Sequence, residues 1–193
     1  MTAKLLASWL LSVMVSSAPP GRSTFPDEAR ESEDQGRARY TEIAEALAQV
    51  SMDPAEPAVF EGKLGRERGA ALMLALAYHE SGLRRDVDLG LGRHHGGGRY
   101  FCLMQVAVDR KINKGKTPEG WTGADLVASR DRCFRAGLHI LQRARPACRK
   151  QGPDAWLRLY TSGHCDRGRE PTAKRLTTWR SWLVKHPLPV PAK

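Results

Sequence analysis

One glutamate of this chain lies where a catalytic acid would be useful. Residues 70–79 are almost continuously apolar and helix-forming, and Glu80 follows them directly, before a Ser-Gly helix stop at 81–82. An apolar wall and the negative end of a helix dipole both favour a protonated carboxyl group, which can then donate its proton near neutral pH. Glu80 is therefore our candidate general acid, against the plain alternative of a solvated residue in a last helical turn.

A mainly α domain must position this glutamate. The helix expected at about 64–80 is nearly all apolar after Gly69, which is typical of a helix buried in the middle of a domain. Residues 81–100 hold six glycines without sustained periodicity and predict a long loop. The sequence is also compatible with short strands within this loop. Apolar spacing predicts the other helices at about 40–50, 131–145, 154–160 and 172–185.

The first residues have the pattern of a secretory signal peptide. Lys4 precedes an apolar run at 5–15, and small residues at 16–18 offer a cleavage site. The run is shorter than the roughly 20 residues that span a bilayer, and no other segment approaches that length. We therefore expect an exported protein, periplasmic or secreted, without an integral membrane span after signal cleavage.

Composition divides the remaining chain. A stretch rich in proline, serine, glycine and charge predicts a disordered linker, and the last residues form a Pro-rich tail. The part between them is long enough for one domain with its own core. The expected organisation is a signal peptide at 1–18, a linker at 19–38, a single domain at 39–185 and the tail at 186–193.

The four cysteines all lie in the second half of the chain, without a Cys-x-x-Cys pair. This pattern suits two disulfides in an exported domain better than a zinc site. One pairing is disfavoured, because a straight helix between Cys133 and Cys148 would separate them by about 22 Å. The other two pairings stay open. The disulfide candidates are Cys102, Cys133, Cys148 and Cys165.

Histidines near the glutamate raise a zinc hypothesis, which the spacing disfavours. His79-Glu80 lacks the second histidine of a His-Glu-x-x-His motif, and His94 and His95 have no partner at ligand spacing. We expect no metal and no cofactor.

The chain is strongly basic, with a net charge of +10 and a pI near 9.8. Such a protein is drawn to an acidic polymer, for which cell wall, anionic lipid and nucleic acid qualify. Export makes nucleic acid the least suitable, so none is expected as a partner. The alternative is that the excess of lysine and arginine only makes the surface soluble and binds no partner.

Four short segments follow one another in a family order. They are His79-Glu80-Ser81-Gly82-Leu83, Cys102-Leu103-Met104-Gln105-Val106, a helical Ala136-Gly137-Leu138, and Leu159-Tyr160-Thr161-Ser162-Gly163. In this order they resemble the Glu-Ser-Gly, Gly-Leu-Met-Gln and Ala-Tyr-Asn-Ala-Gly motifs of the soluble lytic transglycosylase domain. The resemblance covers about residues 66–165 and implies a lysozyme-like fold, similar to goose-type lysozyme.

The resemblance also implies an activity and a site. The substrate would be peptidoglycan glycan strands, cleaved by a monomer at the β-1,4 bond from N-acetylmuramic acid to N-acetylglucosamine. Glu80 would protonate the leaving oxygen and then, as a carboxylate, deprotonate the sugar's 6-hydroxyl, which closes a 1,6-anhydro ring. The implied substrate-binding residues are Ser81, Met104, Gln105, Tyr160 and Ser162.

Departures from the family pattern leave alternatives open. Cys102 stands where the family has glycine, and Thr161-Ser162 replaces Asn-Ala. Asp86 and Asp88 follow Glu80, so either is a candidate second carboxylate of a lysozyme-type hydrolase. A non-catalytic peptidoglycan-binding relic and a membrane-surface role of the basic charge are the other two alternatives.

Overall fold

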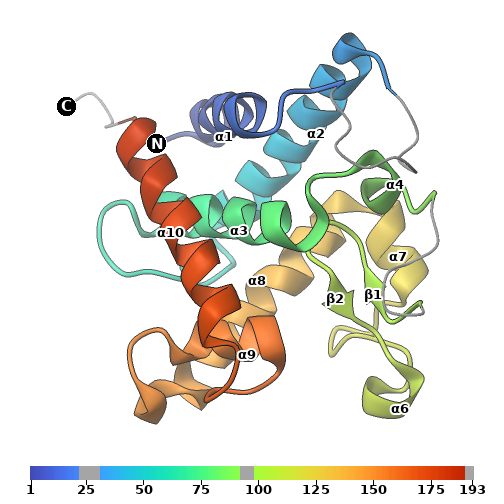
Figure 1. The fold of residues 1–193 in the computed structure, drawn as a ribbon, viewed down its shortest axis with the longest axis vertical. Helices are drawn as coiled ribbons and strands as arrows, with labels where there is room; N and C mark the ends of the chain where they lie inside the picture. The colour runs from blue at the N-terminus through green and yellow to red at the C-terminus, as the bar shows by residue number, and fades with distance from the viewer. Residues whose placement is uncertain (22–30, 92–97, 190–193) are drawn as a thin grey trace.

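The computed structural model describes residues 1–21, 31–91 and 98–189 and is mainly helical, which confirms the predicted class (Figure 1). The larger helices are α1 (Ala3–Ser17), α2 (Glu33–Met52), α3 (Gly65–Ser81), α8 (Arg130–Ala147), α9 (Ala155–Ser162) and α10 (Arg169–Lys185). The short elements are α4 (Arg85–Asp88), α6 (Arg110–Asn113), α7 (Gly123–Ala128), the 3-10 turn η1 (Arg149–Gln151), β1 (Tyr100–Phe101) and β2 (Val106–Ala107).

Helix α3 is the centre of the fold. Residues 70–77 are all fully buried, and α3 contacts α2, α8 and α10 (Figure 1). The helix ends at Gly82, whose left-handed backbone lets its N–H bond the carbonyl of Tyr78. This confirms the helix predicted at 64–80. Helix α3 therefore places Glu80 in its last turn, shortly after the buried residues 70–77.

Helix α2 begins earlier than its apolar spacing suggests. A capping box joins Ser32 and Gln35, and two acidic residues occupy the first turn, so the helix starts at Glu33. Its first turns fall within the stretch for which the sequence predicts a linker. Residues 22–30 of that stretch lie outside the described residues.

The segment predicted as a signal peptide forms α1, which packs mainly on α2 (Figure 1). Leu6, Leu10, Val13 and Met14 are buried. Trp9 also donates from Nε1 to the carbonyl oxygen of His186, at 2.9 Å, and so links α1 to the start of the tail. Among the described residues, no helix is both long and apolar enough to cross a membrane.

A small hairpin forms at the end of the predicted loop at 81–100 and in the residues that follow it. Strands β1 and β2 pair antiparallel, with Tyr100 opposite Ala107 and Phe101 opposite Val106. The turn that joins them, residues 102–105, carries the Cys-Leu-Met-Gln segment. Helices α6 and α7, which the periodicity does not predict, follow the hairpin.

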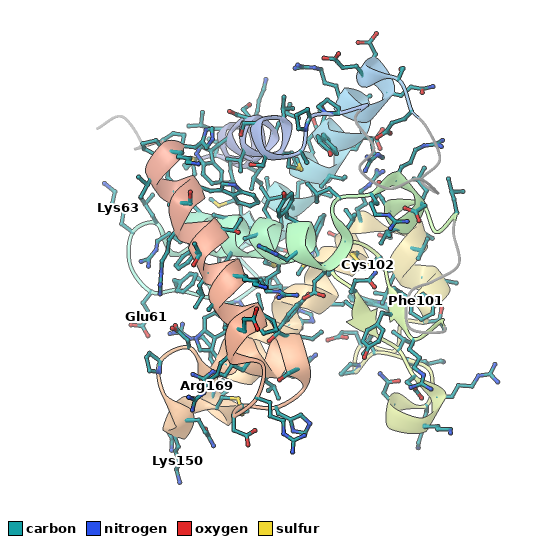
Figure 2. The ribbon with its side chains drawn as sticks, in the orientation of Figure 1. Glu61, Lys63, Phe101, Cys102, Lys150 and Arg169 are labelled. Atoms are coloured by element: carbon teal, nitrogen blue, oxygen red, sulfur yellow. A yellow bond between two sulfur atoms is a disulfide. The ribbon has the colours of Figure 1, made fainter. Side chains whose placement is uncertain are left out.

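Two disulfides brace α8. Cys102 pairs with Cys133, with their Cα atoms 6.0 Å apart, and Cys148 pairs with Cys165, at 5.4 Å. This is one of the two pairings that the sequence leaves open. The first bond ties the hairpin turn to the start of α8, and the second ties the end of α8 to the loop after α9. Cys102 of the first bond is labelled in Figure 2.

Candidate functional site

Glu80 lies in a protected position at the end of α3. Its side chain is 20% exposed, and Arg175 of α10 donates to its Oε1 atom from Nε at 3.1 Å and from Nη2 at 2.7 Å. Burial raises the pKa of Glu80, and the positive charge of Arg175 opposes this without cancelling it. The net shift of the Glu80 pKa is therefore upward, which is the direction that a general acid needs.

Two further contacts hold α10 against the end of α3. The Nε2 atom of His79 and the Oγ1 atom of Thr178 lie 2.8 Å apart, and the rings of Tyr78 and Trp182 meet edge to face. Burial, reinforced by the nearby positive charge of Arg175, lowers the pKa of His79 and keeps the ring neutral. Helix α10 is therefore part of the site, although it lies beyond the stretch that resembles the transglycosylase domain.

Tyr160 of α9 completes the group around Glu80. Its hydroxyl donates to the main-chain carbonyl of Met104 at 2.7 Å. Burial raises the pKa of Tyr160 well above its ordinary value, and the charge of Glu80 adds to this effect. The structure thus brings Glu80 and Tyr160 within electrostatic reach, and Met104 joins them through its backbone rather than its side chain.

The hairpin turn is held in an unusual backbone conformation. Cys102 and Gln105 have φ angles of 59° and 47°, in the left-handed region that favours glycine. Leu83, just after Glu80, has a φ of 54°. Cys102 thus has a backbone conformation that glycine adopts more readily, and its disulfide to Cys133 anchors the turn. Strained residues of this kind concentrate at functional sites.

The other predicted binding residues bond to nearby backbone. Gln105 donates from Nε2 to the carbonyl of Cys102 at 3.0 Å. Ser81 donates to the carbonyl of Ala77 at 2.7 Å, and Ser162 donates to that of Arg158 at 2.8 Å. These contacts support the turn and the ends of α3 and α9, and none of them joins the residue to Glu80.

The two loop aspartates are engaged in ion pairs. Asp86 pairs with Arg84 through both oxygens, at 2.9 and 2.5 Å, and although burial acts to raise its pKa, the bonds to Arg84 outweigh this and lower it. Asp88 is buried and accepts from Nε and Nη2 of Arg130 at 2.9 and 2.7 Å. Asp88 thus anchors the loop to α8, and Asp86 is an ionised carboxylate already paired with arginine.

Arg175 is the site residue that the sequence analysis missed. It lies 95 positions after Glu80 and is one of 31 lysines and arginines. The one available signal is its place in α10, three residues after the buried Thr172 and four before the buried Trp179. An arginine on the buried stripe of a helix needs a partner for its charge.

Gly137 of α8 makes room for the hairpin turn. A Cβ atom there would lie 2.6 Å from Cε and 3.1 Å from Cγ of Met104, which is buried. We expect Gly137→Ala to displace Met104, lengthen the bond from Tyr160 and destabilise the fold by about 1–3 kcal/mol. Urea unfolding measures this change.

Gly69→Ala is the matched control for Gly137→Ala. Its Cβ would lie 3.5 Å from Val59, an ordinary contact, so the helix propensity of alanine should leave stability unchanged or raise it by about 1 kcal/mol. Equal unfolding free energies for the two variants would contradict the close packing of Gly137 on Met104.

Comparisons with known proteins do not identify a relative: no family model, no curated protein and no solved structure matches the chain. The resemblance to the transglycosylase domain therefore rests on the sequence motifs alone. His94 and His95, the two loop histidines of the zinc hypothesis, lie outside the described residues.

Proposed function

We propose that this protein is a peptidoglycan lytic transglycosylase that uses Glu80 as its general acid and base. The observation that carries the proposal is the environment of Glu80 at the end of buried α3. Burial raises the pKa of Glu80, Tyr160 lies within electrostatic reach, and the Glu80 side chain is 20% exposed. A raised pKa is the shift that a glutamic acid needs in order to act as a general acid.

The proposed reaction needs one carboxyl group. Glu80 donates its proton to the glycosidic oxygen as the bond to the anomeric carbon of N-acetylmuramic acid breaks. The resulting carboxylate then removes the proton from the 6-hydroxyl of the same sugar, whose oxygen bonds to the anomeric carbon. The proton returns to Glu80, and the products are a 1,6-anhydro end and a free N-acetylglucosamine end.

The loop aspartates favour this reaction over hydrolysis. An inverting hydrolase needs a second carboxylate free to activate a water molecule. Asp88 is buried in ion pairs with Arg130 and Arg39, and Asp86 is paired with Arg84. A charge of +10 would attract the protein to the anionic cell wall, and two disulfides suit an exported protein.

Mass spectrometry of the soluble products from purified peptidoglycan tests the proposal. The oxidised protein should release anhydro-muropeptides. Muropeptides with reducing ends would instead establish a hydrolase, and Asp86→Asn would then show whether that carboxylate takes part. Retention on the wall without any soluble product would identify a peptidoglycan-binding relic.

A further inference from the structure

The two carboxyl oxygens of Glu80 differ in their surroundings. Both hydrogen bonds from Arg175 end on Oε1, at 3.1 and 2.7 Å. Oε2 accepts no hydrogen bond from any residue that the structure describes. An arginine that served only as a charge partner would often engage both oxygens in a fork. Here one oxygen is held, and the other is left for a different partner.

We propose that Arg175 is a positioning residue for Glu80, which holds Oε1 and thereby makes Oε2 the oxygen that carries the transferred proton. The proposal rests on the function proposed above. Oε1 already accepts two N–H bonds, and adding a proton there would require at least one of them to break. Protonation of Oε2 leaves both bonds in place, and it is therefore the favoured form.

Arg175 is itself held in place. Its side chain is 13% exposed, and its Nη1 atom donates to the carbonyl of Pro171 at 2.9 Å, one turn earlier in α10. The contact of His79 with Thr178 fixes α10 against α3 one turn further along. The guanidinium group of Arg175 is thus fixed next to Glu80 by the contacts of α10. The carboxyl plane of Glu80 therefore has one preferred orientation.

The charge of Arg175 also affects the titration of Glu80. The titratable and charged groups that face Glu80 are Arg175 from α10 and Tyr160 from α9, with His79 beside it on α3. Tyr160 and His79 are neutral near pH 7, so Arg175 is the charge that lowers the pKa of Glu80 against the effect of burial. Removing this charge should raise the pKa and retain the acid to higher pH.

The direct test is a titration of the Glu80 carboxyl carbon by NMR in protein labelled with ¹³C at glutamate Cδ. Comparison with Glu80→Gln assigns the signal. In Arg175→Met the titration should move to higher pH, whereas Arg175→Lys should keep it near that of the wild type, since lysine retains the charge. The exposed Arg180 of the same helix provides the matched control, and Arg180→Met should leave the titration unchanged.

The kinetics of peptidoglycan cleavage distinguish the effect of the Arg175 charge from its effect on the orientation of the Glu80 carboxyl group. A carboxyl group free to rotate is misplaced for proton transfer, so we expect kcat to fall about 100-fold in Arg175→Met with little change in KM. The alkaline limb of the pH–rate profile should move to higher pH in this variant. In Arg175→Lys the limb should return to its wild-type position, but kcat should stay low because an ammonium group cannot donate in the same geometry.

A Glu80 titration and an alkaline limb that do not move in Arg175→Met would overturn the proposal. So would full kcat in Arg175→Lys, because charge alone would then suffice. If Arg175→Met does not fold, Arg175→Lys still decides the orientation through its kcat. The NMR titration does not depend on activity, so a wild-type protein that releases no product would contradict the proposed function without affecting the evidence on the Glu80–Arg175 contact.

Discussion

Glu80→Gln is expected to cleave peptidoglycan about 10²- to 10⁴-fold more slowly than the wild type, which is the usual contribution of a general acid or base. Glutamine keeps the size of the side chain and an oxygen that can accept from Arg175, so the fold and the affinity for the glycan should survive. The substitution removes the carboxyl proton that Glu80 would donate to the glycosidic oxygen. The measurement is the initial rate of release of soluble muropeptides, with the melting temperature recorded alongside.

The pH profile of the wild type supplies an independent check on this role. Glu80 is the active acid only while protonated, so the rate should fall as pH rises through its pKa. Burial raises that pKa, and the alkaline limb should therefore lie above the value expected for an ordinary glutamate. The protonated form is also the one that folding favours, so Glu80 stabilises the fold at low pH and loses this effect as pH rises through its raised pKa.

Glu170→Gln is the matched control, since Glu170 lies on the surface of α10 and pairs with exposed Lys174. It should retain wild-type activity. A Glu80→Gln variant with half of the wild-type rate or more would remove Glu80 from the mechanism, and activity equal to wild type that falls steeply with salt would indicate the membrane-surface role instead.

Replacing Cys102 and Cys133 together by serine is expected to have the second large effect. The bond closes a loop of 31 residues, and its loss should lower the free energy of unfolding by about 3 to 4 kcal/mol through the entropy of the unfolded chain. It should also release the turn at residues 102–105, whose Met104 carbonyl accepts from Tyr160. Denaturant unfolding and the rate of muropeptide release measure the two effects.

Replacing Cys148 and Cys165 by serine is the matched control, because it removes a disulfide without releasing the turn at residues 102–105. This bond closes a loop of 17 residues, so its replacement by serine should cost about 3 kcal/mol, nearly as much. At a temperature where both variants are folded, the loss of activity should be larger for the Cys102–Cys133 variant. Equal losses of activity in the two variants would mean that activity does not depend on the disulfide between the hairpin turn and α8.

The parts of the fold that the sequence predicts well are those in which one continuous pattern decides the structure. Helix α3 is such a case, because its apolar run allows only a buried helix, and Gly82 ends it. Helix α2 shows the limit, since its first turns are polar and gain their stability from caps. The Ser32 and Gln35 signature was present, but the surrounding composition pointed to a linker.

The site could be predicted only where it is local in the sequence. Glu80 and the Cys-Leu-Met-Gln motif at 102–105 each come from one segment, whereas the left-handed backbone of Cys102 and Gln105 was not predicted. Arg175 comes from a different helix, and no pattern links it to residue 80 before the chain is folded. Tyr160 was expected near Glu80 on the motif alone, and in the structure the charge of Glu80 acts on the pKa of Tyr160. A substrate-binding role for Gln105 stays a prediction, and in the structure its Nε2 atom donates to the carbonyl of Cys102 within the same turn.

The position of Arg175 in the chain has a consequence for the order in which the molecule is made. During synthesis, Glu80 emerges about 95 residues before the arginine that orients it. A nascent chain can therefore bury α3 against α2 while its carboxyl group is still unsecured. Glu80 acquires its final geometry only when α10 docks, so the proposed catalytic centre is among the last parts of the domain to be completed, after most of the core that supports it.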